Sequence, residues 1–244
     1  MFDVGLSAVE LAIGIVVVVI AAALQGSIGF GLAVLSVPIL TVVDPVFTPI
    51  PTLILSLIVG AGTLLRERSD LDLEGLGWVI TGRIPGAVLG AWVLSIATER
   101  TLGIVIGVIV LLAVAVLGSG LTVRLSRVSR VVAGLISGFS GTSAGIGGPP
   151  IALLYGRQAG PVVRSTLGAI FTIGITINLA ILTLLGVLTA TDVAVAAILT
   201  PAVLVGFMIS GSLRPHVDGD RVRVGILIVS SLAALSLLVS SLAG

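Results

Sequence analysis

Residues 167–188 read LGAIFTIGITINLAILTLLGVL, a run of 22 residues without a charged side chain. A helix of about 20 apolar residues is long enough to cross the hydrocarbon core of a bilayer, so this stretch predicts a transmembrane helix. Similar apolar runs recur along the rest of the chain, at residues 9–24, 78–97, 102–117, 193–213 and 224–242. The chain is therefore expected to cross a membrane many times.

The composition leads to the same fold class. Of 244 residues, 57% are hydrophobic and 9% are charged, whereas about a quarter of the residues are charged in a typical soluble domain. Continuous apolar runs without in/out alternation exclude a transmembrane barrel, so the backbone polar groups must be satisfied within helices. We predict an all-α, multi-pass membrane protein with one transmembrane domain over residues 1–244. Because residues 1–4 carry no positive charge, the first apolar run is expected to remain as a helix.

The sequence offers little for enzyme chemistry. The chain has no cysteine, and its single histidine, His216, lies in a predicted loop beside Arg214, Asp218 and Asp220. No second histidine and no carboxylate pair within the apolar runs is available to hold a metal or to act in acid–base catalysis. We therefore predict no enzymatic activity, no metal, no cofactor and no nucleic-acid partner.

Glycines and prolines recur at an offset of 116 residues, which suggests a duplicated unit. The matching pairs are Gly29 and Gly145, Gly31 and Gly147, Pro85 and Pro201, and Gly90 and Gly206. Chance is the alternative explanation, because the chain has 32 glycines. A helical unit followed by its copy is a recurring plan of transporters. We predict two repeats, at about residues 1–121 and 122–244.

The arginines suggest how the repeats are oriented. Each half divides into five apolar segments, at residues 6–24, 32–43, 50–65, 76–97 and 102–121, and at 128–139, 149–156, 164–188, 192–213 and 222–243. If all five segments cross, or if the first two form a hairpin, ten of the twelve arginines fall in loops on one side. Treating the first two segments as a single crossing splits the arginines between both sides. Because short cytoplasmic loops are rich in Lys and Arg, the first arrangement is favoured. It makes the halves inverted repeats with both termini outside the cytoplasm.

The second segment of each half is short. Residues 149–156 would make about 12 Å of helix, which is less than half of a bilayer. We expect residues 128–156 to form a re-entrant hairpin with its tip near the midplane. If the first half has the same arrangement, residues 9–43 form a hairpin that enters the membrane from the opposite side. Their first arm is long enough to cross the bilayer fully, so both possibilities remain open.

Glycine-rich breaks interrupt two apolar runs, at residues 25–31 (QGSIGFG) and 140–150 (SGTSAGIGGPP). An interrupted helix leaves unpaired backbone amides and the positive end of its dipole, and both favour an anion. The hydroxyls of Ser27, Thr142 and Ser143 could add donors. Close helix packing is the alternative role for such glycines. The substrate-binding residues predicted at the two breaks are Gln25, Gly26, Ser27, Gly29, Gly31, Gly141, Thr142, Ser143, Gly145, Gly147 and Gly148.

Two polar residues within the apolar runs complete the predicted binding site. Arg83 lies before Pro85 in the fourth segment, where it either supplies a fixed positive charge to the substrate pathway or extends to the membrane interface. Asn178 lies in the middle of residues 167–188, and it serves either as a donor in the pathway or as a contact between helices.

The two glycine-rich breaks, the duplication and the chain length resemble the TauE/SafE sulfite exporter family. The matching pieces are residues 26–38 in the first half, and residues 138–150 with Arg164, Ser165 and Thr166 in the second. The resemblance implies a permease of a prokaryotic inner membrane linked to sulfite and organosulfonates. The first break departs from the second because Leu32 stands at the position of Gly148.

The sequence and the resemblance together predict a secondary transporter of a small anion, with sulfite or an organosulfonate first in line. Alternating access around a fixed site at the midplane is the expected cycle. The alternatives are an anion channel and a membrane-embedded assembly factor without transport activity. Besides the anion and the lipid bilayer, the partners considered are a coupling proton or other ion and a second copy of the chain.

Overall fold

The computed structural model describes residues 5–121, 123–217 and 220–243. Within these residues the chain forms ten α-helices and two short 3-10 helices, η1 (Pro45–Phe47) and η2 (Arg68–Asp70). The α-helices are α1 (Ala8–Ile28), α2 (Leu32–Val43), α3 (Ile50–Arg66), α4 (Leu73–Ile96), α5 (Glu99–Gly118), α6 (Arg127–Ala144), α7 (Gly148–Tyr155), α8 (Gly160–Leu184), α9 (Ala190–Val217) and α10 (Asp220–Ala243).

The all-helical fold class predicted from the sequence is confirmed. Among the described residues, six helical stretches are long and apolar enough to cross a membrane, namely α1, η1 with α3, α4, α5, α8 and residues Ala190–Leu213 of α9. Large apolar side chains cover the outside of the bundle: Trp92 is 60% exposed, Leu112 61% and Met208 79%. Such a surface is stable against lipid and unstable against water. The chain is therefore a multi-pass membrane protein.

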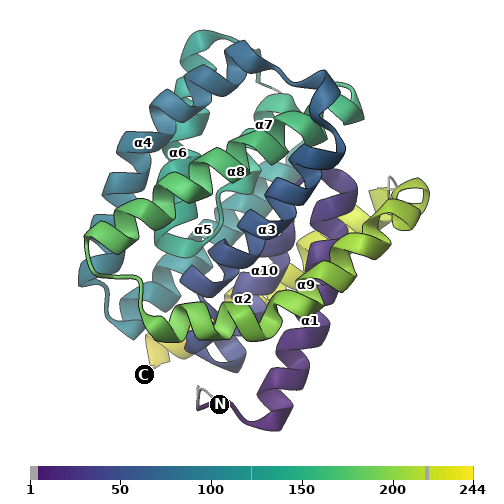
Figure 1. Cartoon of the computed structure of the whole chain (residues 1–244). Coiled ribbons are helices and arrows are strands. Elements are labelled where there is room, and N and C mark those ends of the chain that lie inside the picture. The colour runs from purple at the N-terminus through teal and green to yellow at the C-terminus, as the bar shows by residue number, and fades with distance from the viewer. Residues whose placement is uncertain (1–4, 122, 218–219, 244) are drawn as a thin grey trace.

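Two pairs of helices fold back on themselves as hairpins (Figure 1). The hydroxyl of Tyr155, at the end of α7, donates to Asp72 over 3.0 Å, and Asp72 also pairs with Arg130 near the start of α6. The two arms of the α6–α7 hairpin therefore begin and end at the same end of the bundle. The α1–α2 hairpin returns to the opposite end, where Phe47, just after α2, packs within 3.1 Å of the Cβ position of Gly14 in α1.

Helix α4 packs against α6 with almost no space between the two backbones. A Cβ atom on Gly86 would lie 2.1 Å from the carbonyl oxygen of Leu135, and one on Gly134 would lie 2.1 Å from that of Val79. Small residues at four-residue spacing allow this approach, as is common between membrane helices. The contact holds Arg83, in the middle of α4, directly against the α6–α7 hairpin.

Candidate functional site

Both hairpins turn at a glycine with a positive φ angle. Helix α1 ends at Gly29, whose φ is 95°, and helix α6 ends at Gly145, whose φ is 75°. Residues other than glycine rarely adopt this left-handed conformation. The chain then starts a new helix, α2 at Leu32 and α7 at Gly148. The helix breaks within the apolar runs thus follow from the glycines at these positions.

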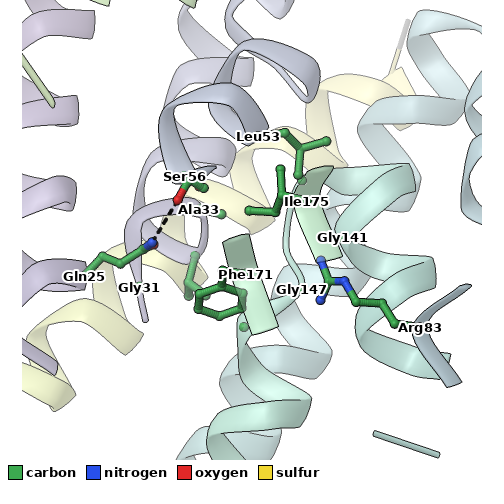
Figure 2. A pocket seen from close by; sticks show the side chains of 13 residues that line it. Gln25, Gly31, Ala33, Leu53, Ser56, Arg83, Gly141, Gly147, Phe171 and Ile175 are labelled. Carbon is green, nitrogen blue, oxygen red and sulfur yellow. Dashed lines mark hydrogen bonds between the residues drawn. The ribbon is translucent and has the colours of Figure 1, made fainter. Parts of the chain in front are cut away.

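The two breaks meet around a cavity inside the bundle (Figure 2). The Cβ position of Gly148, at the start of α7, lies 3.4 Å from Cβ of Phe30 in the other break. Helices α3, α4 and α8 close the sides. The lining residues are Gln25, Gly31, Ala33, Val34, Leu53, Ser56, Arg83, Gly141, Gly145, Gly147, Gly148, Phe171 and Ile175.

Arg83 supplies the charge of this cavity. Its side chain is 1% exposed, and Nη1 donates to Ser137 Oγ over 2.6 Å. Nε has no hydrogen-bond partner in the described part of the chain, and Arg83 takes part in none of the ion pairs seen there. A buried charge usually has a partner. Arg83 is therefore a buried cation that has no counter-ion within the part of the chain that the structure describes.

Neighbouring residues make room for this arginine and fix its direction. A Cβ atom on Gly174 in α8 would lie 2.0 Å from Arg83 Nε, so the arginine occupies space that another residue at position 174 would fill. Ser137, which accepts from Arg83, donates in turn to the carbonyl oxygen of Gly147 over 2.5 Å. The guanidinium group is thereby held toward Gly141 and Gly147 of the second break (Figure 2).

The starts of α2 and α7 contribute backbone amides. The first N–H groups of a helix have no partner within the helix. In α2 the side-chain oxygen of Gln25 accepts from Leu32 N over 3.2 Å, which leaves the amides of Gly31, Ala33 and Val34. In α7 the second and third residues are prolines without an N–H group, which leaves the amides of Gly147 and Gly148. None of these five amides bonds to a described residue, and all five residues line the cavity.

Sequence reasoning missed two side chains. Ser56 in α3 lines the cavity, is 5% exposed, and its Oγ has no hydrogen-bond partner among the described residues. Ser137 lies behind Arg83 and orients it. Both serines lie in apolar stretches and outside the glycine-rich breaks, and the local sequence of Ser56 does not distinguish it from other serines. The spacing of Ser137 one helical turn before Gly141 is the one available signal.

The predicted residues are divided by the structure into two groups. Gln25, Gly31, Arg83, Gly141, Gly145, Gly147 and Gly148 line the cavity, whereas Gly26, Ser27, Gly29, Thr142, Ser143 and Asn178 do not.

Other contacts occupy most of the second group. The hydroxyls of Thr142 and Ser143 donate to carbonyl oxygens four residues earlier, and Ser27 donates to Ala23 and to Ser210 in α9. Asn178 differs, because both its polar atoms are buried without a partner among the described residues. Its Nδ2 lies 3.4 Å from the Cβ position of Gly141, which is itself 3.3 Å from Arg83 Nη2.

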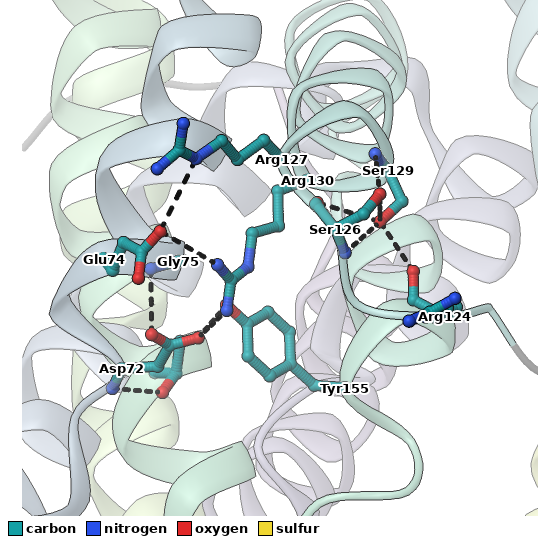
Figure 3. A network of polar contacts seen from close by, with 10 residues as sticks. Asp72, Glu74, Gly75, Arg124, Ser126, Arg127, Ser129, Arg130 and Tyr155 are labelled. Carbon is teal, nitrogen blue, oxygen red and sulfur yellow. Dashed lines mark hydrogen bonds and ion pairs between the residues drawn. The ribbon is translucent and has the colours of Figure 1, made fainter.

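Two polar clusters tie the helices together at the end of the bundle where α6 begins. In the first, Asp72 at the start of α4 accepts from Arg130 over 2.8 Å and from the Tyr155 hydroxyl (Figure 3). Burial and the Asp72 carboxylate raise the pKa of Tyr155, so that its hydroxyl stays a donor. In the second, Arg164 at the start of α8 pairs with Glu67 over 2.6 Å.

Arg66 belongs to the second cluster and contacts the first break. Its guanidinium donates to the carbonyl oxygen of Gly26 and to Ser210 Oγ, and lies 4.5 Å from the ring centre of Phe207. This arginine thus anchors the end of α1 to α3 and α9.

No group of three or more potential metal ligands occurs in the described part of the chain. The side chains of Arg214, His216, Asp218, Asp220, Arg221 and Arg223 lie outside the described residues.

A comparison with protein families identifies the chain. The family model described as "Sulfite exporter TauE/SafE" matches residues 14–237. The chain belongs to the TauE/SafE sulfite exporter family. This family consists of membrane transporters, in agreement with the prediction that the chain is not an enzyme. Comparisons with curated proteins and with solved structures give no match. A TauE/SafE protein handles an anionic substrate in a lipid bilayer, which agrees with a cavity whose charged lining residue is the buried Arg83.

Proposed function

We propose that this protein is a secondary transporter of a small oxyanion, sulfite or an organosulfonate, and that the anion binds in the cavity between the two helix breaks. The observation that supports this proposal most strongly is Arg83, a buried cation that lines the cavity and has no counter-ion among the described residues. Removing a charge from water costs several kcal/mol unless an opposite charge compensates it. A bound anion provides that compensation.

The proposed binding mode uses the backbone as well as the arginine. The free amides at the starts of α2 and α7 and the positive ends of the two helix dipoles approach the anion from opposite hairpins. The Ser56 hydroxyl adds a side-chain donor, and Gln25 holds the start of α2 by bonding Leu32 N and the carbonyl oxygen of Ser56. Glycines at positions 141, 145, 147 and 148 let the anion approach the backbone closely.

The two halves are proposed to be inverted repeats, with the arginine-rich end in the cytoplasm. The packing supports this, because α4 of the first half packs on α6 as α9 of the second packs on α1. Gly90 and Gly206, which are 116 residues apart, lie at these two contacts, with their Cβ positions 2.5 and 2.3 Å from carbonyl oxygens of Phe139 and Val19.

Alternating access is the proposed cycle, powered by the gradient of the substrate or of a coupled ion. The Glu67–Arg164 and Asp72–Arg130 ion pairs lie at the arginine-rich end, and we propose that they keep this end closed. No ion pair joins helices at the opposite end in the described part of the chain. The cavity is then expected to reach the cytoplasm after these pairs separate.

Flux into proteoliposomes tests the proposal. Sulfite, sulfate, sulfoacetate, chloride and a neutral solute are compared, each with and without a pH gradient. Saturable uptake of sulfite, accelerated by unlabelled sulfite on the other side, is the expected result. Flux without saturation or exchange would instead indicate a channel. Uptake of the neutral solute alone, or no protein-dependent flux of any solute, would refute anion transport.

A further inference from the structure

The balance of charge and hydrogen-bonding groups in the cavity bears on the ionic form of the substrate. Arg83 is the sole charged side chain among the lining residues, and these include no Asp, Glu, His or Tyr. The N-terminal ends of α2 and α7 are the positive ends of the two helix dipoles. They attract an anion but add no net charge to the cavity. A monoanion therefore makes the occupied site neutral, whereas a dianion leaves it with one uncompensated negative charge, which is costly away from water.

Other ionisable groups on the surrounding helices lie outside the cavity. Toward the arginine-rich end these are Asp72 and Glu74 at the start of α4, Arg127 and Arg130 on α6, Tyr155 on α7, Arg164 on α8, Arg66 at the end of α3, and Glu67 just after it. Toward the opposite end lie Glu10 on α1 and Asp44 after α2. Glu74 and Arg130 are nine and seven residues from Arg83 and Ser137, or about 13 and 10 Å along their helices. Arg66, Glu67 and Arg164 interact with one another and hold the outside of the first break.

The hydrogen-bonding groups of the cavity also match a partly protonated anion. The free backbone amides and Arg83 are donors. Ser56 Oγ, buried and without a partner among the described residues, can accept as well as donate. A substrate that carries its own proton can use this acceptor, whereas a fully deprotonated oxyanion has acceptors only.

We infer that the site selects singly charged oxyanions, so that sulfite crosses the membrane as hydrogensulfite and carries the coupled proton itself. This inference rests on the proposed function and specifies the substrate form. The lining residues offer no side chain that exchanges a proton near neutral pH, so the protein needs no proton site of its own. Sulfite transport is then accompanied by a proton, whereas transport of an alkyl sulfonate, which is a monoanion without an acidic proton, is not.

The sign of the pH change inside vesicles tests this inference. Proteoliposomes filled with a pH-sensitive dye receive sulfite, methanesulfonate or sulfate near neutral pH. Hydrogensulfite that enters releases protons and acidifies the lumen, whereas the sulfite dianion would bind protons and make it alkaline. We expect acidification with sulfite, uptake without a pH change for methanesulfonate, and no uptake of sulfate. Sulfite flux should also fall about tenfold per pH unit once the dianion predominates.

Controls separate this inference from the proposed function. Vesicles with Arg83→Met measure the passive leak of sulfur dioxide, and vesicles with Arg157→Gln, which alters an exposed arginine, should behave like the unmodified protein. Protein-dependent alkalinisation by sulfite, or uptake of sulfate at the rate of methanesulfonate, would overturn the monoanion inference while leaving anion transport intact. Absence of protein-dependent flux for all three anions would refute the proposed function and this inference together.

Discussion

Replacing Arg83 by methionine separates a binding role from a structural one. The change removes the cation and keeps an unbranched side chain in the same space. An arginine near the centre of a membrane helix costs about 2.5–3.5 kcal/mol on insertion scales, and the lost hydrogen bond from the guanidinium to Ser137 is worth about 1.5–3 kcal/mol. Because these two effects oppose each other, the free energy of unfolding should change by less than about 2 kcal/mol.

The effect of Arg83→Met on transport should be much larger. Removing one partner of a buried charge pair costs about 2–5 kcal/mol, which corresponds to a loss of roughly 30-fold to several thousand-fold in substrate affinity. Arg83→Lys keeps the charge but not the planar fork of donors, so an intermediate loss is expected. Concentration-dependent uptake into proteoliposomes and the melting temperature in detergent measure the two effects, with Arg157→Gln as the matched control. Uptake within threefold of the unmodified protein, or a variant that fails to fold, would refute this reasoning.

Three further substitutions test the surroundings of the site. Gly174→Ala places a methyl group 2.0 Å from the guanidinium and should lower uptake at least about tenfold by overpacking, with no change in oligomer profile. Gly86→Val should prevent folding, because its Cβ would lie 2.1 Å from a backbone oxygen, whereas Gly77→Val, with open space around it, should fold normally. Glu67→Gln weakens the ion pair with Arg164 at the arginine-rich end. If this lowers the free energy of opening that end by about 1 kcal/mol, the labelling from the cytoplasmic side of a cysteine introduced at Ala33 should rise about fivefold. Unchanged labelling would show that this pair does not hold that end closed.

The helices were predictable from the sequence because hydropathy determines which segments lie in the bilayer. The predicted segment at residues 149–156 corresponds to α7 (Gly148–Tyr155), and the predicted segment at residues 32–43 coincides with α2. Helix ends were less predictable: α6 continues to Ala144 although its predicted segment ended at residue 139. The glycines and hydroxyl residues at 138–143 are compatible with a helix when its surroundings are apolar.

The binding site was predictable as a region but not as a set of side chains. The glycine-rich breaks and Arg83 indicated where an anion could bind, and several of these residues line one cavity. Thr142 and Ser143 were expected to offer hydroxyl donors, but within an apolar helix such hydroxyls bond to the carbonyl one turn earlier. Ser56 was missed because its relation to the cavity depends on how α3 packs against both breaks, which no local pattern records.

The central claim is that both helix breaks and Arg83 form a single anion site. Calorimetric titration of the purified protein in detergent with sulfite tests it most directly, using the unmodified chain, Arg83→Met, Gly147→Val in the second break and Ala33→Phe in the first. The account predicts one site per chain, with affinity reduced at least about tenfold in each variant that remains folded. Binding of unchanged affinity and stoichiometry in Arg83→Met, or in the variant of either break, would contradict it.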